Sequence, residues 1–434
     1  MSSIPFGHQF KDKYFGYLDP EVTLTNHGSF GTTPGIVVDA AKRALERHEK
    51  YPCRDALYTV TDEYKRQLKL VAGYLGLEYL NCAFVTNATT GVNTVLRSIP
   101  FDFQKDKVLF HSTTYGACAN TVKFLHDYFG LQYDVVEINY PCEDDSVLEA
   151  FEAKLKTKEY KLCLFDLISS HPGVTIPYKG IIELCHKYDT WSLIDGAHSA
   201  GQVDLKFINE LKPDFFTTNL HKWLYCPKSV ALLYVDPKHH AMIQTMPISH
   251  NYSSPDCQYI EGNDEHNANL LINKFAFVGT ASYASYMACE VALTFRKEIC
   301  GGEDKIRQYQ FQLQEKAIPK VLEVFGEGSK LLENSTNTLR PPGLFCVELP
   351  IPEDLKFLVT KMTADPVFFA KFKATCEKTA VFDHKCHAPF TLNNNHIFVR
   401  FSVQVFNEVQ DYEKAAAVVK GIIYENLRKE ASSS

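Results

Sequence analysis

Two side chains in the middle of the chain have types that suit chemistry on a flat, electrophilic ligand. Asp195 ends the apolar run WSLID, and the small residues Gly196 and Ala197 after it leave room for a planar group. A carboxylate buried at a strand end needs a cationic partner, and a protonated pyridine nitrogen is one. Lys222 follows in TTNLHKWL, and its amine could form an imine with an aldehyde. Asp195 alone could be a carboxylate that caps a turn, and Lys222 alone could be a solvated surface charge. The two residues together indicate a site.

Two further loops could complete such a site. In FVTNATTGVNTVL, Ala88 and Thr89 would open a helix whose free N–H groups and dipole favour a phosphate. Asn87 or Thr89 could equally be a plain N-cap. Tyr115 follows the run KVLFHSTT and could stack on a ring, although a tyrosine at the start of a helix is more often simple packing.

A buried arginine is predicted near the end of the chain. Arg400 lies within the apolar run HIFVRFSV, where a guanidinium is costly unless an anion meets its donors. A substrate carboxylate fits that fork in a bidentate way. A salt bridge to a buried Asp or Glu is the alternative.

The elements that must position these residues follow from hydrophobic patterning. From about Cys82 to Val235, short β-rich runs alternate with helical patterns, which predicts a parallel sheet wrapped by helices. Ligands of such sheets lie beyond the carboxyl ends of the strands, where the polar residues above fall. Residues 33–76 read as helices, 236–278 as irregular and 343–427 as a smaller α+β unit. We therefore expect an N-terminal segment (1–35), a large cofactor-binding domain (36–300) and a small C-terminal domain (301–434).

Composition narrows the class of protein. The 434 residues carry a formal charge of -7 and contain no long basic run, which argues against nucleic acid as a partner. No stretch of about 18 apolar residues occurs, so no membrane span and no signal peptide are expected. Thirteen cysteines are scattered without C-x-x-C pairs, which is typical of reduced thiols and a cytoplasmic location.

Taken in order, six short motifs resemble the class V aminotransferase family over nearly the whole chain. They are NHGSFG (26–31), NATTGVN (87–93), DGAHSAGQ (195–202), NLHKWL (219–224), GT (279–280) and RFSVQVFNE (400–408). The chain is most similar to the isopenicillin N epimerase-like branch, which includes fungal hercynylcysteine sulfoxide lyases and plant-type cysteine desulfhydrases. The resemblance implies a pyridoxal-phosphate-dependent enzyme of fold type I, with a mainly parallel seven-stranded sheet, helices on both faces and a smaller α+β domain.

The resemblance also assigns roles to single residues. It makes Lys222 the residue that binds pyridoxal 5'-phosphate covalently, Asp195 the partner of the pyridine nitrogen, Tyr115 the stacking side chain and His198 a neighbour of the phenolic oxygen. It places Ala88, Thr89, Asn219 and His221 at the phosphate, and Thr280 there from the partner subunit of a homodimer. On the substrate side it places Arg400 at the carboxylate and Asn26 nearby. Val278 and Ser282, which flank Gly-Thr, depart from the aromatic residue and Asp common in epimerase-like relatives.

Several reactions on an amino-acid substrate are compatible with these residues. Loss of a sulfur group from Cβ, a C–S lyase reaction that leaves pyruvate and ammonia, ranks first. A persulfide-forming desulfurase ranks second, because Cys386 in DHKCHAPF resembles the mobile cysteine segment of some desulfurases, although it could be an unreactive thiol. Epimerisation ranks third because it needs a second acid, and a non-catalytic binding protein of the same fold is the remaining alternative.

Overall fold

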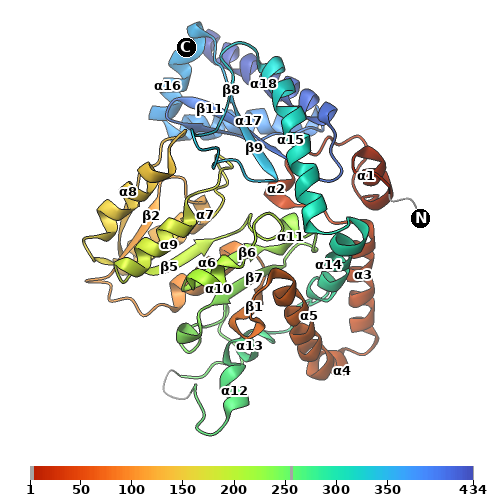
Figure 1. Ribbon diagram of the computed structural model, residues 1–434, viewed down its shortest axis with the longest axis vertical. Coiled ribbons are helices and arrows are strands. Elements are labelled where there is room, and N and C mark those ends of the chain that lie inside the picture. The colour runs from red at the N-terminus through yellow and green to blue at the C-terminus, as the bar shows by residue number, and fades with distance from the viewer. Residues whose placement is uncertain (1–3, 255–257, 434) are drawn as a thin grey trace.

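Seven strands form one large sheet in the order β1-β7-β6-β5-β4-β2-β3 (Figure 1). The computed structural model describes residues 4–254 and 258–433. The strands are β1 (Cys82–Val85), β2 (Lys107–His111), β3 (Gln132–Val136), β4 (Tyr160–Asp166), β5 (Trp191–Asp195), β6 (Phe215–Asn219) and β7 (Ala231–Val235). β7 runs antiparallel to both of its neighbours, and the other paired strands are parallel. The predicted, mainly parallel sheet is therefore confirmed.

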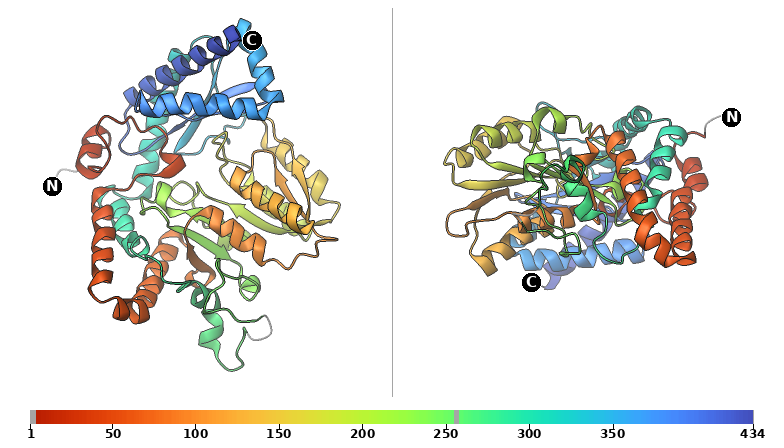
Figure 2. Two further views of the ribbon diagram at one scale, coloured as in Figure 1. Left: turned by 180° about the vertical axis from the view of Figure 1, so that it is seen from behind. Right: turned by 90° about the horizontal axis from the view of Figure 1, so that it is seen from below.

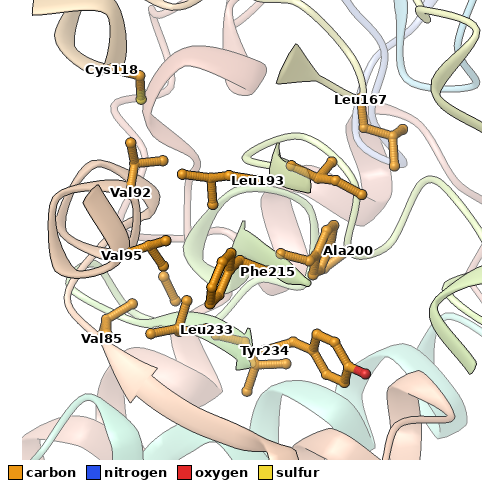
Figure 3. Close-up of a cluster of buried hydrophobic side chains, with 14 of the residues drawn as sticks. Val85, Val92, Val95, Cys118, Leu167, Leu193, Ala200, Phe215, Leu233 and Tyr234 are labelled. Carbon is orange, nitrogen blue, oxygen red and sulfur yellow. The ribbon is translucent and has the colours of Figure 1, made fainter. Parts of the chain in front are cut away.

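Other parts of the chain pack against both faces of the large sheet. Neighbouring residues of a strand point to opposite faces, and every residue of β6 and β7 is buried, so both faces must be packed. Figure 3 shows Val92 and Val95 facing Leu193, Phe215 and Leu233 of the sheet. The edge strand β3 is exposed or half-buried over most of its length, and for this reason the sequence QYDVV carries no clear strand signal.

Helices follow the strands in the alternating order that the sequence predicts. In and around the large sheet they are α3 (Gly35–Lys50), α4 (Pro52–Arg54), α5 (Val60–Leu75), α6 (Ala88–Ser98), α7 (Gly116–Phe129), α8 (Asp144–Leu155), α9 (Tyr178–Lys187), α10 (Phe207–Leu211), α11 (Leu220–Trp223), α12 (Asp264–Ala268), α13 (Leu270–Phe275) and α14 (Cys289–Thr294). Pro52 is the first residue of α4, and Tyr51 separates this helix from α3. Within residues 4–254 and 258–433, no helix is both long and apolar enough to cross a membrane.

A second, four-stranded antiparallel sheet has its own hydrophobic core. Its order is β10-β11-β9-β8, with β8 (Lys330–Leu331), β9 (Leu344–Leu349), β10 (Phe390–Asn393) and β11 (His396–Ser402). The helices beside it are α15 (Glu303–Phe325), α16 (Lys356–Ala364), α17 (Pro366–Phe382) and α18 (Val409–Ser433). Figure 2 shows α17 and α18 packed side by side at this end of the molecule. Two short N-terminal helices, α1 (His8–Tyr14) and α2 (His27–Phe30), complete the chain, and the three-part domain division stays a prediction.

Candidate active site

A cavity of about 430 Å³ lies where the carboxyl ends of β4, β5 and β6 meet the starts of α6 and α7. It brings together most of the residues that the sequence predicts for the site. The lining side chains are Ser29, Phe30, Asn87, Ala88, Thr89, Thr90, Tyr115, Asp166, Ser170, Asp195, Ala197, His198, Asn219, His221 and Lys222. Parallel strands end at the same edge of a sheet, and this explains why residues far apart in sequence gather here.

Lys222 lies in α11, the single helical turn directly after β6, and its amine is buried at the cavity. The backbone carbonyl of Lys222 lies 2.7 Å from His27 Nε2, and Arg296 donates to the carbonyl of the next residue, Trp223. Burial, and then the charge of Arg400, lowers the pKa of Lys222 to about 8. A lysine in this state is partly an uncharged nucleophile near neutral pH.

Asp195 is a buried carboxylate without a cation in contact. One carboxylate oxygen accepts the N–H of Ala197 at 3.0 Å, and the other accepts the thiol of Cys118 at 3.1 Å. No Lys, Arg or His in the described part of the chain reaches salt-bridge distance of these oxygens. Burial, and then the neighbouring Asp166, raises the pKa of Asp195 to about 6. The site therefore offers a negative charge that a cationic ring nitrogen would satisfy.

The start of α6 forms the other end of the cavity. Asn87 is the N-cap, because its side-chain oxygen accepts the N–H of Thr90 at 2.8 Å, as the plain N-cap alternative expected. The N–H of Ala88 donates to Asn219 Oδ1 at 2.8 Å, which joins this helix to the end of β6. His221 Nδ1 lies 2.9 Å from the carbonyl of Val230, and burial lowers the pKa of its ring to about 4. Capping and anion binding do not exclude each other, because the cap satisfies the N–H of Thr90, whereas the N–H of Thr89 has no partner among the described residues.

Arg400 projects from β11 of the small sheet and is 1% exposed. Its guanidinium donates to the carbonyl of Ser170 at 2.7 Å, to Asn26 Oδ1 at 2.9 Å and to Ser29 Oγ at 2.6 Å. These partners are neutral, so the predicted alternative of a buried ion pair is absent from the described residues. Burial lowers the pKa of Arg400 to about 10. Ser29 and Ser170 line the cavity in front of it, whereas Arg400 and Asn26 lie one layer behind.

Three predicted residues differ in how they meet the cavity. Tyr115 lines it, is 44% exposed and immediately precedes α7, and burial raises the pKa of its phenol. Thr280 is exposed and does not line the cavity of its own chain. Cys386 is 2% exposed within the hydrophobic core of the small sheet, and burial raises the pKa of its thiol to about 11.

The structure places several further residues at the site that the sequence patterns did not indicate. Asp166 ends β4 as Asp195 ends β5, and the two are register partners, so the same signal of a strand-ending carboxylate could have found it. Cys118 and Trp223 carried no such signal, because a buried cysteine or tryptophan is read as core. Ser29 lies in the short helix α2 and Ser170 in the loop after β4, and the approach of both to Arg400 depends on tertiary structure.

Comparison with known proteins identifies what the chain is similar to. The family model described as Aminotransferase class-V matches residues 31–357. The hercynylcysteine sulfoxide lyase of Schizosaccharomyces pombe is 27% identical, over 96% of this chain and 97% of the relative. A putative L-cysteine desulfhydrase of Oryza sativa subsp. japonica is 25% identical over 94% of this chain and 85% of its own length.

Solved structures share the fold at low sequence identity. A complex of the cystine C–S lyase C-DES with cysteine persulfide aligns with a TM-score of 0.70 and 16% identity, over 94% of this chain and 99% of that one. A cysteine desulfurase from Thermococcus onnurineus aligns with a TM-score of 0.69 and 16% identity, over 98% and 100% of the two chains.

Proposed function

The chain belongs to the aminotransferase class-V family, and we propose that it is a pyridoxal-phosphate-dependent C–S lyase acting on a cysteine-derived amino acid. The observation that carries the proposal is one cavity that joins a lysine of lowered pKa, a carboxylate without a cation and, one layer behind, an arginine without an anion. These are the complements of an aldehyde, a pyridinium and an amino-acid carboxylate.

The residues of the cavity fit the cofactor. Asp195 would hold the ring nitrogen, because its buried carboxylate lacks a cation in the protein itself. The first turn of α6, at Ala88 and Thr89, would hold the phosphate together with Asn219 and His221. Tyr115 would stack on the ring and His198 would lie near its phenolic oxygen. When bound, the cofactor supplies an electron-poor ring that stabilises negative charge at the substrate Cα.

Arg400 would bind the carboxylate of the substrate. Its neutral partners Asn26, Ser29 and Ser170 hold the guanidinium in place without neutralising it. A substrate carboxylate that displaces Ser29 and Ser170 from the guanidinium would pair with it and orient the substrate in the cavity, with the Cα proton toward Lys222. The amine of Lys222, with a pKa of about 8, is suited to take that proton near neutral pH.

The position of Cys386 favours the lyase over a desulfurase. A desulfurase needs a thiolate that reaches the substrate sulfur, and the thiol of Cys386 is buried in the small-sheet core with a raised pKa. Elimination of the sulfur group needs no protein thiol. Cys386→Ala is therefore expected to leave pyruvate release unchanged, and loss of a persulfide product in this variant would favour the desulfurase instead.

Two broader features are part of the proposal. A homodimer would bring Thr280 of one chain to the phosphate end of the partner's cavity, in line with its exposure outside the cavity of its own chain. A cytoplasmic location is supported by the cysteines of the described residues, all of which are free thiols. Cys257 lies outside those residues.

The test is pyruvate release by the cofactor-loaded protein across a panel of cysteine conjugates that includes hercynylcysteine sulfoxide, cysteine and a thioether. Lys222→Ala is the blank, and Lys316→Ala, a change at an exposed lysine, is the matched control. Pyruvate that depends on Lys222 and not on Lys316 would support the lyase and identify its substrate. Absence of pyruvate with every conjugate would contradict it and direct the work to persulfide and epimerase assays.

A further inference from the structure

The side chain next to the reactive lysine in sequence also contacts the site, through a histidine. The indole Nε1 of Trp223 lies 3.3 Å from His198 Nδ1, and Nζ of Lys222 lies 3.2 Å from His198 Nε2. An indole N–H can only donate, so His198 Nδ1 must accept. The proton of the neutral ring is then on Nε2, the nitrogen that faces Lys222.

We propose that Trp223 is a positioning residue that fixes His198 as a neutral ring with its proton on Nε2. His198 then presents a permanent N–H donor to the cavity. In the cofactor-free protein this N–H faces Nζ of Lys222, which can accept it once the amine is uncharged, above the lysine pKa of about 8. In the cofactor-bound protein the Nε2–H of His198 would face the phenolic oxygen of the cofactor. This part of the proposal rests on the proposed function.

The surroundings of His198 oppose a second proton. The ring is 2% exposed, and the titratable or charged groups that face it are Lys222, Arg400, His171 and His27. Burial and each of these groups lower the pKa of His198 well below its usual value. A protonated Nδ1 would in addition point a second donor at the indole N–H, so Trp223 removes the remaining site for a proton.

The indole itself has little freedom. A Cβ atom added to Gly343 would lie 2.7 Å from Trp223 Cζ3, and one added to Gly28 would lie 3.0 Å from Cζ2. The backbone of His198 is tied to the same wall, since Gln202 donates to the His198 carbonyl at 3.0 Å and accepts the N–H of Gly343 at 2.7 Å. The donor and the acceptor are therefore both held rigidly, and a rigid donor is one that can select a tautomer.

The test replaces one N–H group and leaves the shape unchanged. The chain has two tryptophans, and Trp191→Phe leaves Trp223 as the single one. In this background Trp223 can be replaced by benzothienylalanine, an isostere of tryptophan that has sulfur in place of the N–H. Trp191 lies at the opposite end of β5, where it packs on Phe215 and His239, and its change serves as the control. The readout is the protonation of the His198 ring nitrogens by ¹⁵N NMR of histidine-labelled protein, with His198→Gln identifying the signal.

In the Trp191→Phe control we expect a proton on Nε2 and none on Nδ1, both at pH 9 without cofactor, where the Lys222 amine is mostly uncharged, and between pH 6 and 8 with cofactor. In the isostere we expect the proton affinity of Nδ1 to rise about tenfold, since a hydrogen bond to the neutral form is lost. A proton on Nδ1 in the control, or identical ring states in both proteins, would overturn the proposal. Measurement on the cofactor-free protein keeps this result separate from any failure of the proposed function.

A rescue experiment distinguishes positioning from mere packing. In His198→Gln the side-chain oxygen can accept the indole N–H, which turns the amide N–H groups toward Lys222, whereas His198→Leu offers neither contact. We expect the absorbance spectrum of the bound cofactor to be near that of the unmodified protein in His198→Gln and shifted in His198→Leu. Equal spectra for the two variants would contradict a donor role.

Discussion

At the scale of single residues, two buried cations meet the site in different ways. Arg400 donates to four neutral acceptors, which belong to Ser170, Asn26 and Ser29, whereas Nζ of Lys222 lies near a single ring nitrogen. The first cation is therefore held in its charged form for an anion, and the second is biased toward its uncharged form.

The planar guanidinium group of Arg400 leads to a prediction on substrate affinity. Arg400→Lys keeps the charge but loses the planar pair of donors, so KM for a substrate of the lyase should rise about 10- to 100-fold, with a smaller change in kcat. Steady-state kinetics would measure this. Arg340→Lys, which changes an arginine paired with Glu315 away from the cavity, is the control. An unchanged KM in Arg400→Lys would mean that the carboxylate binds elsewhere.

The lowered pKa of Lys222 leads to a prediction on stability. Because its pKa is about 8 when folded and near 10.5 when unfolded, the unfolded chain binds more protons between these values, and the free energy of unfolding rises with pH there. The buried lysine is half charged at pH 8 and almost fully charged one pH unit lower, about pH 7. Lys222→Met should therefore stabilise the cofactor-free protein by about 1–3 kcal/mol at pH 7. Urea denaturation should show the gain shrinking above pH 8, and a gain that grows with pH would be the wrong sign.

At the scale of elements, the loop that leaves β7 is held by another buried lysine. Lys274 of α13 donates to the carbonyls of His240, Ala241 and Ile243 and to Gln258 Oε1, over 2.8–3.1 Å. Its pKa is also lowered to about 8, by burial. Lys274 differs from Lys222 because its ammonium is the hydrogen-bond donor to four oxygens.

The two buried lysines should therefore respond in opposite directions. Lys274→Met would leave buried acceptors without a donor and should lower the free energy of unfolding by about 2–4 kcal/mol. Limited proteolysis should cut faster between residues 236 and 275 in this variant. Lys316→Met, at an exposed position, controls for the loss of a positive charge. Equal resistance to proteolysis in the unmodified protein and the two variants would show that Lys274 does not hold the loop.

At the scale of the whole molecule, the proposed dimer predicts a native mass of twice the 49.2 kDa chain. It also predicts complementation between two defective chains. If Thr280 acts in the partner's cavity, mixing Lys222→Ala with Thr280→Ala chains creates hybrid dimers with one intact site, and about a quarter of the wild-type activity should return. Activity no higher than that of the two parent proteins would place Thr280 in its own chain's site or outside any site.

Sequence patterns determined the sheet and the placement of most site residues. Strand-ending polar residues such as Asp195 and Asn219, and the helix start at Ala88, were predictable because hydrophobic runs mark strands and ligands gather at their carboxyl ends. The resemblance supplied the roles, which stay predictions until they are measured.

Tertiary structure alone decided the partners of those residues. No pattern in the sequence shows that Arg400 meets Asn26 and Ser29 and not a carboxylate, that Trp223 donates to His198, or that Cys386 lies in a core. Periodicity reports which face of an element is buried, a local property of the chain. Hydrogen-bond partners and pKa shifts depend on atoms brought within a few ångströms by segments that are hundreds of residues apart, as Arg400 and Asn26 are.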